Sequence, residues 1–239
     1  MEKSKVNRAG FSLLEILVVV VVIALLLTLV VGGLFKARQR AERSVAQQEL
    51  NAVAALLENY YNDLHAYPDS TPAGIITSGS VALAEGLVGW QPFAEDGAGV
   101  ANGDPTDYGF RLQPGGRGRI FGPYLLPTGK NYDPVRHVVL DHWGNPILYY
   151  RAVPATTGRV TRSVTRVFGT TADGVFVAGD NTAAGNPAVS AAFLSLVGDA
   201  NGNNTIDAGE MIANRDAYLL VSAGPDGVYF TADDLINTK

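Results

Sequence analysis

Residues 11–35 form the feature that most constrains this chain, because Glu15 is the only charged residue in a run of 25. As a helix, the run would rise about 37 Å, enough to cross a hydrocarbon core of roughly 30 Å. It is longer than the apolar core of a cleaved secretory signal, and no small-x-small cleavage pattern follows it. The run therefore predicts a membrane-spanning helix that stays on the protein.

The next segment, residues 36–64, predicts an amphipathic continuation of the same helix. Its apolar residues recur every three or four positions, which is the spacing of one helix face. They are Ala46, Leu50, Val53, Leu57, Tyr60 and Leu64. No proline interrupts residues 11–67, so we expect one helix from Phe11 to Leu64, with a bend or local melt at Gly32 and Gly33.

A short leader, residues 1–10, precedes the apolar run and carries three basic residues against one acidic residue. A basic stretch before an apolar helix is typical of a cytoplasmic flank. Together with Gly10, Phe11 and Glu15, this leader resembles the processing site of type IV pilins and type II secretion pseudopilins. The resemblance implies that a membrane aspartyl protease, the prepilin peptidase, cuts after Gly10 and methylates the new N-terminal Phe11.

Glu15 has two explanations at this stage. With Ser12 it forms an S-x-x-E capping box, and an acidic residue suits the N-terminus of a helix. In the family that the motif resembles, the carboxylate at this position pairs with the Phe11 amine of a neighbouring subunit and sets the register of a filament. An unpaired carboxylate in an apolar run is costly to bury, which favours the filament role.

Residues 68–239 predict a globular domain of short elements and long loops. We expect a helix over residues 80–87 and a hairpin of strands 137–140 and 147–151 around the turn Asp141–Pro146. Further strands are predicted at 159–167, 175–178 and 218–221, and residues 188–197 fit either a helix or a strand. The fold class is α+β, with the long N-terminal helix packed on a small antiparallel β-sheet domain.

The predicted organisation has four parts. They are a cleaved leader (1–10), the transmembrane and filament-core half of the helix (11–35), the amphipathic half (36–67), and a periplasmic globular domain (68–239) that ends in a calcium loop. Within the domain, residues 122–125 and the turn around Trp143 resemble the sheet of the major type II secretion pseudopilin. His142 stands where that family has a proline.

Residues 222–236, SAGPDGVYFTADDLI, resemble the C-terminal calcium loop of the same family. Calcium takes six to eight oxygen ligands, and four side chains here could supply them. They are Ser222, Asp226, Asp233 and Asp234. The chain has no cysteine, so a metal is one way to fix its end, because metal binding contributes folding energy. A solvated surface turn is the alternative.

A second candidate calcium loop spans residues 199–210, outside the family resemblance. Its residues match positions 1, 3, 5, 7, 9 and 12 of an EF-hand loop. They are Asp199, Asn201, Asn203, Thr205, Asp207 and Glu210. Asn204 stands at the position of the usual glycine, and asparagine tolerates the left-handed conformation needed there. A metal-free turn rich in Asn and Gly is the alternative.

The sequence contains no catalytic constellation, so we do not expect an enzyme, and its net charge of −5 gives no reason to expect nucleic-acid binding. The resemblance implies a structural subunit of a type II secretion pseudopilus, held in the bacterial inner membrane by a single span. Its implied partners are further copies of itself in a helical filament, minor pseudopilins, the prepilin peptidase, the inner-membrane assembly platform and the membrane.

Two alternatives remain open from the sequence. The first is a major or minor type IV pilin for adhesion, motility or DNA uptake, with the globular domain outside the cell. The second belongs to another class: a membrane-anchored calcium-dependent enzyme or binding module.

Overall fold

In the computed structural model, the chain divides into two compact units, Met1–Ser44 and Val45–Lys239. Only part of the chain is described. The described residues are 13–69, 78–89, 108–109, 119–127, 129–152, 167–168, 176–177, 180–181, 191–202, 210–211, 214 and 217–237; within them, only the backbone is described at 28–33, 167–168, 177 and 192–193.

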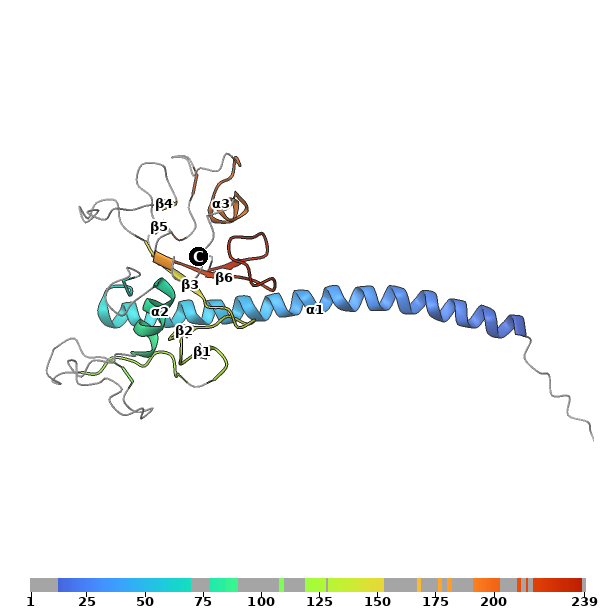
Figure 1. Cartoon of the computed structure of the whole chain (residues 1–239), viewed down its shortest axis with the longest axis horizontal. Coiled ribbons are helices and arrows are strands. Elements are labelled where there is room, and N and C mark those ends of the chain that lie inside the picture. Colours follow the sequence, from blue (N-terminus) through green and yellow to red (C-terminus); the bar gives the residue numbers. More distant parts are fainter. Residues whose placement is uncertain are drawn as a thin grey trace, which may run out of the picture. The chain divides into compact units, whose positions relative to one another are not determined.

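Helix α1 runs from Leu13 to Leu64, which confirms the predicted long helix (Figure 1). It continues through Gly32 and Gly33, so the expected local melt is wrong. In the first unit, the large apolar side chains of residues 13–27 are 49–85% exposed. A search of the described residues finds no helix with both the length and the apolar character needed to cross a membrane. The predicted span also includes residues 11, 12 and the side chains of 28–33, which lie outside that description.

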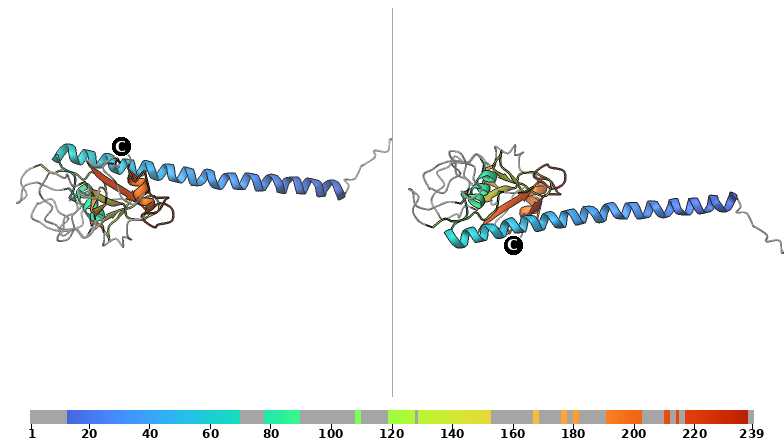
Figure 2. Two further views of the ribbon diagram at one scale, coloured as in Figure 1. Left: turned by 90° about the horizontal axis from the view of Figure 1, so that it is seen from above. Right: turned by 90° about the horizontal axis from the view of Figure 1, so that it is seen from below.

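In the second unit, residues 45–64 of α1 bury the face that the spacing predicts. Ala46, Leu50, Val53 and Leu57 are 0–8% exposed, whereas Tyr60 and Leu64 are only partly buried. The four buried side chains join a core cluster that includes residues of α2 (Gly79–Val88) and of the main sheet. Figure 2 shows this part of the helix alongside the sheet from two opposite sides.

Helix α2 begins and ends at residues suited to those positions, and it confirms the helix predicted over 80–87. The Ser78 side chain accepts a hydrogen bond from the amide of Val81, and Gly89 ends the helix with a φ of 70°. The helix lies so close to the sheet that a Cβ on Gly79 would stand 2.0 Å from the Tyr149 carbonyl oxygen. Glycine is therefore required where α2 meets the sheet.

The main sheet has the order β3-β6-β7, with both pairs antiparallel. Its strands are β3 (Leu148–Arg151), β6 (Tyr218–Ser222) and β7 (Leu235–Ile236). Alternate side chains face opposite ways: Tyr149 and Leu220 join the cluster around α1, while Tyr150 and Leu219 join a second cluster. That second cluster includes Val197 of α3 (Ala191–Val197), so the ambiguous segment 188–197 contains a helix.

The predicted hairpin of 137–140 and 147–151 is wrong beyond its turn. Strand β2 (Val138–Val139) pairs with β1 (Tyr132–Asp133), whereas β3 pairs with β6. The backbone pairing across the turn consists of the bridge between Leu140 and Pro146 and of short hydrogen bonds such as that from Ile147 to Val139. Pro146 has no N–H to donate, so it helps to end the ladder at this point.

A further short pair consists of β4 (Val167–Phe168) and β5 (Phe176–Val177), which are antiparallel. They coincide with the ends of the strands predicted at 159–167 and 175–178, whose other residues lie outside the described part. The strand predicted at 218–221 is confirmed as β6. The α+β fold class is likewise confirmed, with α1 followed by small antiparallel sheets.

Candidate functional site: the N-terminal helix and the C-terminal acidic loop

The N-terminal motif enters the described part of the chain at the first turn of α1. Glu15 lies in that turn and is exposed. Gly10, Phe11 and Ser12 are outside the described residues, so the structure does not test the cleavage site or the capping box. The residues that follow Glu15 are apolar on every face of the helix and exposed on every face, from Ile16 to Leu27. Such a surface suits an apolar solvent or a bundle of like helices.

The C-terminal acidic loop gathers several oxygens around one hydroxyl, that of Thr231. The four oxygens lie 2.6–3.3 Å from Thr231 Oγ1 and belong to Asp226, Val228, Asp233 and Asp234. One hydroxyl proton can serve only one of them at a time. Three of the four are carboxylate oxygens, so the loop concentrates negative charge at one point.

Asp234 is the most buried of these carboxylates, at 1% exposed. Its Oδ2 accepts a 2.6 Å hydrogen bond from the amide of Phe230. Burial raises the pKa of the Asp234 carboxyl to about 6, and the charge of Asp233 adds to this rise. Hydrogen bonds from Phe230 and Thr231 act in the opposite direction. A buried carboxylate beside others is stabilised by a cation.

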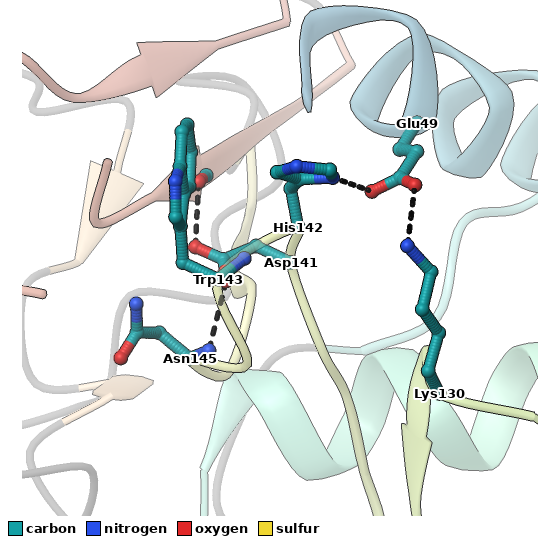
Figure 3. Close-up of polar contacts among 7 residues, drawn as sticks. Glu49, Lys130, Asp141, His142, Trp143 and Asn145 are labelled. Atoms are coloured by element: carbon teal, nitrogen blue, oxygen red, sulfur yellow. Dashed lines mark hydrogen bonds and ion pairs between the residues drawn. The ribbon is translucent and has the colours of Figure 1, made fainter. Parts of the chain in front are cut away.

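Ser222, predicted as a ligand in the same loop, makes a different contact. Its hydroxyl donates to Asp141 Oδ2 at 2.7 Å, and both residues are buried. The other oxygen of Asp141 accepts from the amides of Trp143 and Asn145 (Figure 3). Asp141 thus ties the Trp143 turn to the base of the acidic loop, while the hydroxyl group near the carboxylates belongs to Thr231.

The loop also packs against the Trp143 turn at its outer end. The hydroxyl of Tyr229 donates to the carbonyl of Pro146, and a Cβ on Gly227 would lie 3.4 Å from Asn145 Oδ1. Gly224 and Gly227 both have positive φ, and a Cβ on Gly224 would stand 2.7 Å from the Asp233 carbonyl. The two glycines therefore let the loop fold tightly enough to bring Asp226 to the paired carboxylates.

The donor set around Thr231 consists of oxygens alone, as calcium prefers. Among the described residues, however, no group of three or more His, Cys, Asp or Glu side chains is arranged so that it could hold a metal ion directly. The carboxylates are joined through the Thr231 hydroxyl, so their oxygens would have to move closer together to bind an ion directly. Thr231 and the Val228 carbonyl were missed from the sequence, although a hydroxyl two residues before a carboxylate pair is a usable signal.

The second candidate loop is described only at its two ends. Glu210 Oε1 accepts hydrogen bonds from the amides of Ala200 and Asn201, at 2.9 and 3.1 Å. Asp199 is 2% exposed, and its Oδ1 accepts from the amide of Gly202. The first and last predicted ligands therefore lie at one place, whereas Asn203, Thr205 and Asp207 lie outside the described residues.

Comparison with known proteins agrees with the motif. Residues 5–31 match the prokaryotic N-terminal methylation motif. The chain is 41% identical to type II secretion system core protein G of Pseudomonas aeruginosa over 69 residues, which are 29% of this chain and 48% of that protein. It is 29% identical to the protein of the same name from Xanthomonas campestris over 136 residues, 54% of this chain and 89% of that one.

The match thus spans about half the length of the Pseudomonas relative and most of the Xanthomonas relative. No solved structure matches the chain significantly. Among known proteins, the chain is therefore similar to prepilin-type proteins, and within them to core protein G of type II secretion systems.

Proposed function

We propose that this chain, which carries a prepilin-type methylation motif and is related to core protein G of type II secretion systems, is a structural subunit of a secretion pseudopilus. In this proposal, copies leave the inner membrane and join a helical filament in the periplasm, whose growth drives protein export. The globular domain faces the periplasm throughout, and the chain acts mechanically, without catalysis.

The observation that carries this proposal is the surface of α1. Its large apolar side chains from Leu13 to Leu27 are 49–85% exposed, while four apolar residues between 45 and 57 are nearly fully buried. One helix thus contains an exposed apolar region and a buried apolar face. A bilayer before assembly and neighbouring helices after it would bury the first region.

The proposed partners follow from the same surface and from the motif. Prepilin peptidase would cut between Gly10 and Phe11, which leaves a free amine on Phe11 and makes Glu15 the fifth residue of the mature chain. In an apolar bundle, the carboxylate of Glu15 needs a cation, and the Phe11 amine of a neighbouring copy provides one. An inner-membrane assembly platform and minor pseudopilins complete the proposed set.

We also propose that the acidic C-terminal loop binds calcium. The carboxylates of Asp226, Asp233 and Asp234 converge on Thr231, and the Val228 carbonyl adds a neutral oxygen. An ion would offset the charge that burial makes costly at Asp234. Ser222 would act indirectly, because its hydroxyl holds the base of the loop to Asp141 by a hydrogen bond. The loop 199–210 is a second calcium proposal, supported by the hydrogen bond from the amide of Ala200, the residue after Asp199, to Glu210.

The filament proposal can be tested with Glu15→Gln in the bacterium that makes the protein. We expect the variant to be processed and retained in the membrane but to yield no filaments in the sheared fraction when overproduced. Glu42→Gln, at a partly exposed position on the same helix, is the matched control and should assemble normally. Filaments formed by Glu15→Gln in wild-type amounts would contradict the proposal.

A deletion of the gene distinguishes the pseudopilus from the alternative of a surface pilus. Loss of protein export, with adhesion and twitching motility intact, supports the pseudopilus. Loss of adhesion or motility, with export intact, would instead identify a type IV pilin.

Calcium binding can be tested on the full chain in detergent by thermal unfolding with calcium or with a chelator. We expect calcium to raise the melting temperature of the wild type, and Asp233→Ala with Asp234→Ala to remove that response. Asp133→Ala, a carboxylate that caps the β1–β2 turn, is the matched control and should keep it. An unchanged calcium response in the double variant would contradict the C-terminal site.

A further inference from the structure

The segment of α1 that follows the apolar run is strongly basic. Residues 36–43 carry four basic side chains and one acidic side chain. They are Lys36, Arg38, Arg40 and Arg43, with Glu42 as the acid, and α1 is continuous through them. All of them belong to the first compact unit, so this charge lies within one part of the molecule. Neither the cleavage motif nor the buried face of α1 accounts for it.

An ion pair divides the four basic side chains between two faces of the helix. Arg38 Nε lies 2.8 Å from Glu42 Oε1, four residues further along, so these two charges compensate each other. Lys36, Arg40 and Arg43 follow one another at spacings of four and three, which places them on one helix face. Arg38 lies on the opposite side, because a step of two residues turns a helix by about 200°.

Lys36, Arg40 and Arg43 thus form a basic face, and all three residues are exposed. Within the described residues, no carboxylate forms an ion pair with any of the three. Like charges three or four residues apart on a helix repel one another and destabilise it slightly. The basic face is therefore stabilised by an anionic partner from outside the chain.

The basic face begins where the apolar run ends. Residues 16–35 carry no charge, and as a helix they rise about 30 Å, the thickness of a hydrocarbon core. Lys36 is the next residue, and Arg43 lies about 10 Å further along the helix axis. With residues 16–35 in the hydrocarbon core, the basic face lies at the depth of the lipid head groups, which its long side chains can reach.

The orientation of the chain does not explain this charge. Lysine and arginine are normally in excess on the cytoplasmic side of a membrane span. In the proposed function, the basic leader lies on that side and is removed, whereas residues 36–43 lie on the periplasmic side. Phosphate is the anion that every phospholipid places at this depth, and arginine binds phosphate through paired hydrogen bonds. Lipid phosphate therefore matches both the position and the chemistry of the basic face.

We propose that the basic face binds the head groups of anionic phospholipids in the periplasmic leaflet of the inner membrane. These contacts hold α1 at a fixed depth before assembly, and a subunit has to release them when it joins a filament. This role rests on the membrane anchoring of α1 in the proposed function, and it does not depend on calcium.

The lipid selectivity of the reconstituted full chain tests the basic face. The protein is placed in phosphatidylcholine vesicles with spin-labelled phosphatidylglycerol or spin-labelled phosphatidylcholine, and electron paramagnetic resonance measures the share of label held at the protein. We expect the wild type to prefer phosphatidylglycerol by about fivefold, the contribution of one lysine or arginine near a membrane surface. Lys36→Gln combined with Arg40→Gln and Arg43→Gln should remove this preference. A triple variant that keeps it would overturn the proposal.

Arg38→Gln with Glu42→Gln is the matched control, because it alters the same turns of the helix without a change in net charge. Glutamine has a high helix propensity, so both sets of substitutions should leave α1 helical. The control should keep the full preference for phosphatidylglycerol. A loss as large as that of the triple variant would show that the basic face is not its cause, and would also overturn the proposal.

Inorganic phosphate separates a lipid site from a site for the free anion. Added to the vesicles at constant ionic strength and at the concentration of the labelled lipid, it should leave the preference for phosphatidylglycerol unchanged. Loss of the preference would indicate a site for the free anion instead. If the triple variant failed to form filaments but kept its lipid preference, the partner of the basic face would be a neighbouring copy. Either result would overturn the proposal.

Alkaline extraction of the vesicles tests the membrane anchoring separately. We expect the wild type to stay in the bilayer. Its release would refute the anchoring in the proposed function, and the lipid contacts with it. A wild type that stays in the bilayer but holds both labelled lipids equally would refute the lipid contacts alone.

Discussion

Two regions of helix α1 have opposite relations to the rest of the chain. From Leu13 to Leu27, every large apolar side chain is about half exposed or more, whereas from Ala46 to Leu57 the apolar face is almost completely buried. Both regions are helical, and both are rich in apolar residues. The difference lies in the pattern, because the first is apolar on every face and the second on one face only.

This comparison separates the apolar residues that fold the chain from those that serve another purpose. The residues between 46 and 57 contribute to the core of the second unit, with α2 and the sheet. The large apolar residues between 13 and 27 are exposed instead, and in the proposed function they are buried in a bilayer or among other helices. Substitutions in the two regions should therefore affect different measurements.

The largest expected difference is between Leu57→Ala and Leu17→Ala. Leu57 is 0% exposed in the core, so its truncation should lower the free energy of unfolding of the domain by about 2–5 kcal/mol. Leu17 is 58% exposed, so the same truncation should change that free energy by less than about 0.5 kcal/mol. Urea unfolding followed by near-ultraviolet circular dichroism measures both. Equal effects would remove the distinction between the two regions.

The second prediction concerns pH and the buried Asp234. Its pKa, raised to about 6, lies above that of the unfolded chain, so the folded state retains a proton that the unfolded state loses first. The metal-free domain should therefore lose stability, on the order of 2 kcal/mol, as pH rises from about 4 to 6. Asp234→Asn should remove this part of the pH dependence. If the pH profile of stability in Asp234→Asn were identical to that of the wild type, ionisation of Asp234 would carry no cost in folding free energy.

Most of α1 could be predicted from the sequence, because periodicity over many residues specifies both the helix and its buried face. Ala46, Leu50, Val53 and Leu57 are the confirmed examples. The strand pairing could not be predicted, because β2 and β3 flank a good turn but take different partners. Local turn chemistry indicates where the chain reverses, and only long-range packing decides which strands then pair.

The residues of the candidate sites could likewise be predicted only in part. The acidic residues of the C-terminal loop could be found from their spacing, and the structure brings Asp226, Asp233 and Asp234 to one hydroxyl. Sequence reasoning assigned the hydroxyl to Ser222, which instead binds Asp141, 81 residues away in the chain. The contact of His142 with Glu49 (Figure 3) was likewise beyond reach, because no local pattern reports a pair separated by about ninety residues.

The third prediction concerns the tyrosines that join α1 to the sheet. The hydroxyl of Tyr218 lies 3.0 Å from the Ala54 carbonyl and 3.2 Å from Glu58 Oε1, and the residue is buried. Tyr218→Phe should lower the free energy of unfolding by about 1–2 kcal/mol, because a partly buried acceptor loses its donor. Tyr61→Phe, at a position 40% exposed, is the control and should have an effect below about 0.5 kcal/mol. Equal effects would mean that the tyrosine contacts add little to the attachment of α1.

The smallest effect is expected for the exposed ion pair between Arg38 and Glu42, which lies in the first unit. Their atoms are 2.8 Å apart, but the side chains are 79% and 38% exposed. Glu42→Gln should lower helix stability by only about 0.3–0.5 kcal/mol, as measured by the loss of helical circular dichroism on heating. A larger loss would indicate that the helix around Arg38 and Glu42 depends more strongly on this ion pair than the exposure of the two side chains suggests.

The central claim is that the apolar region of α1 is kept on the mature protein and used for assembly after removal of the leader. Mass spectrometry of the protein purified from its own membranes tests this most directly. We expect a mature chain that begins at N-methylated Phe11 and retains residues 11–35. A chain that retains Met1, or one that begins beyond Phe35, would contradict it.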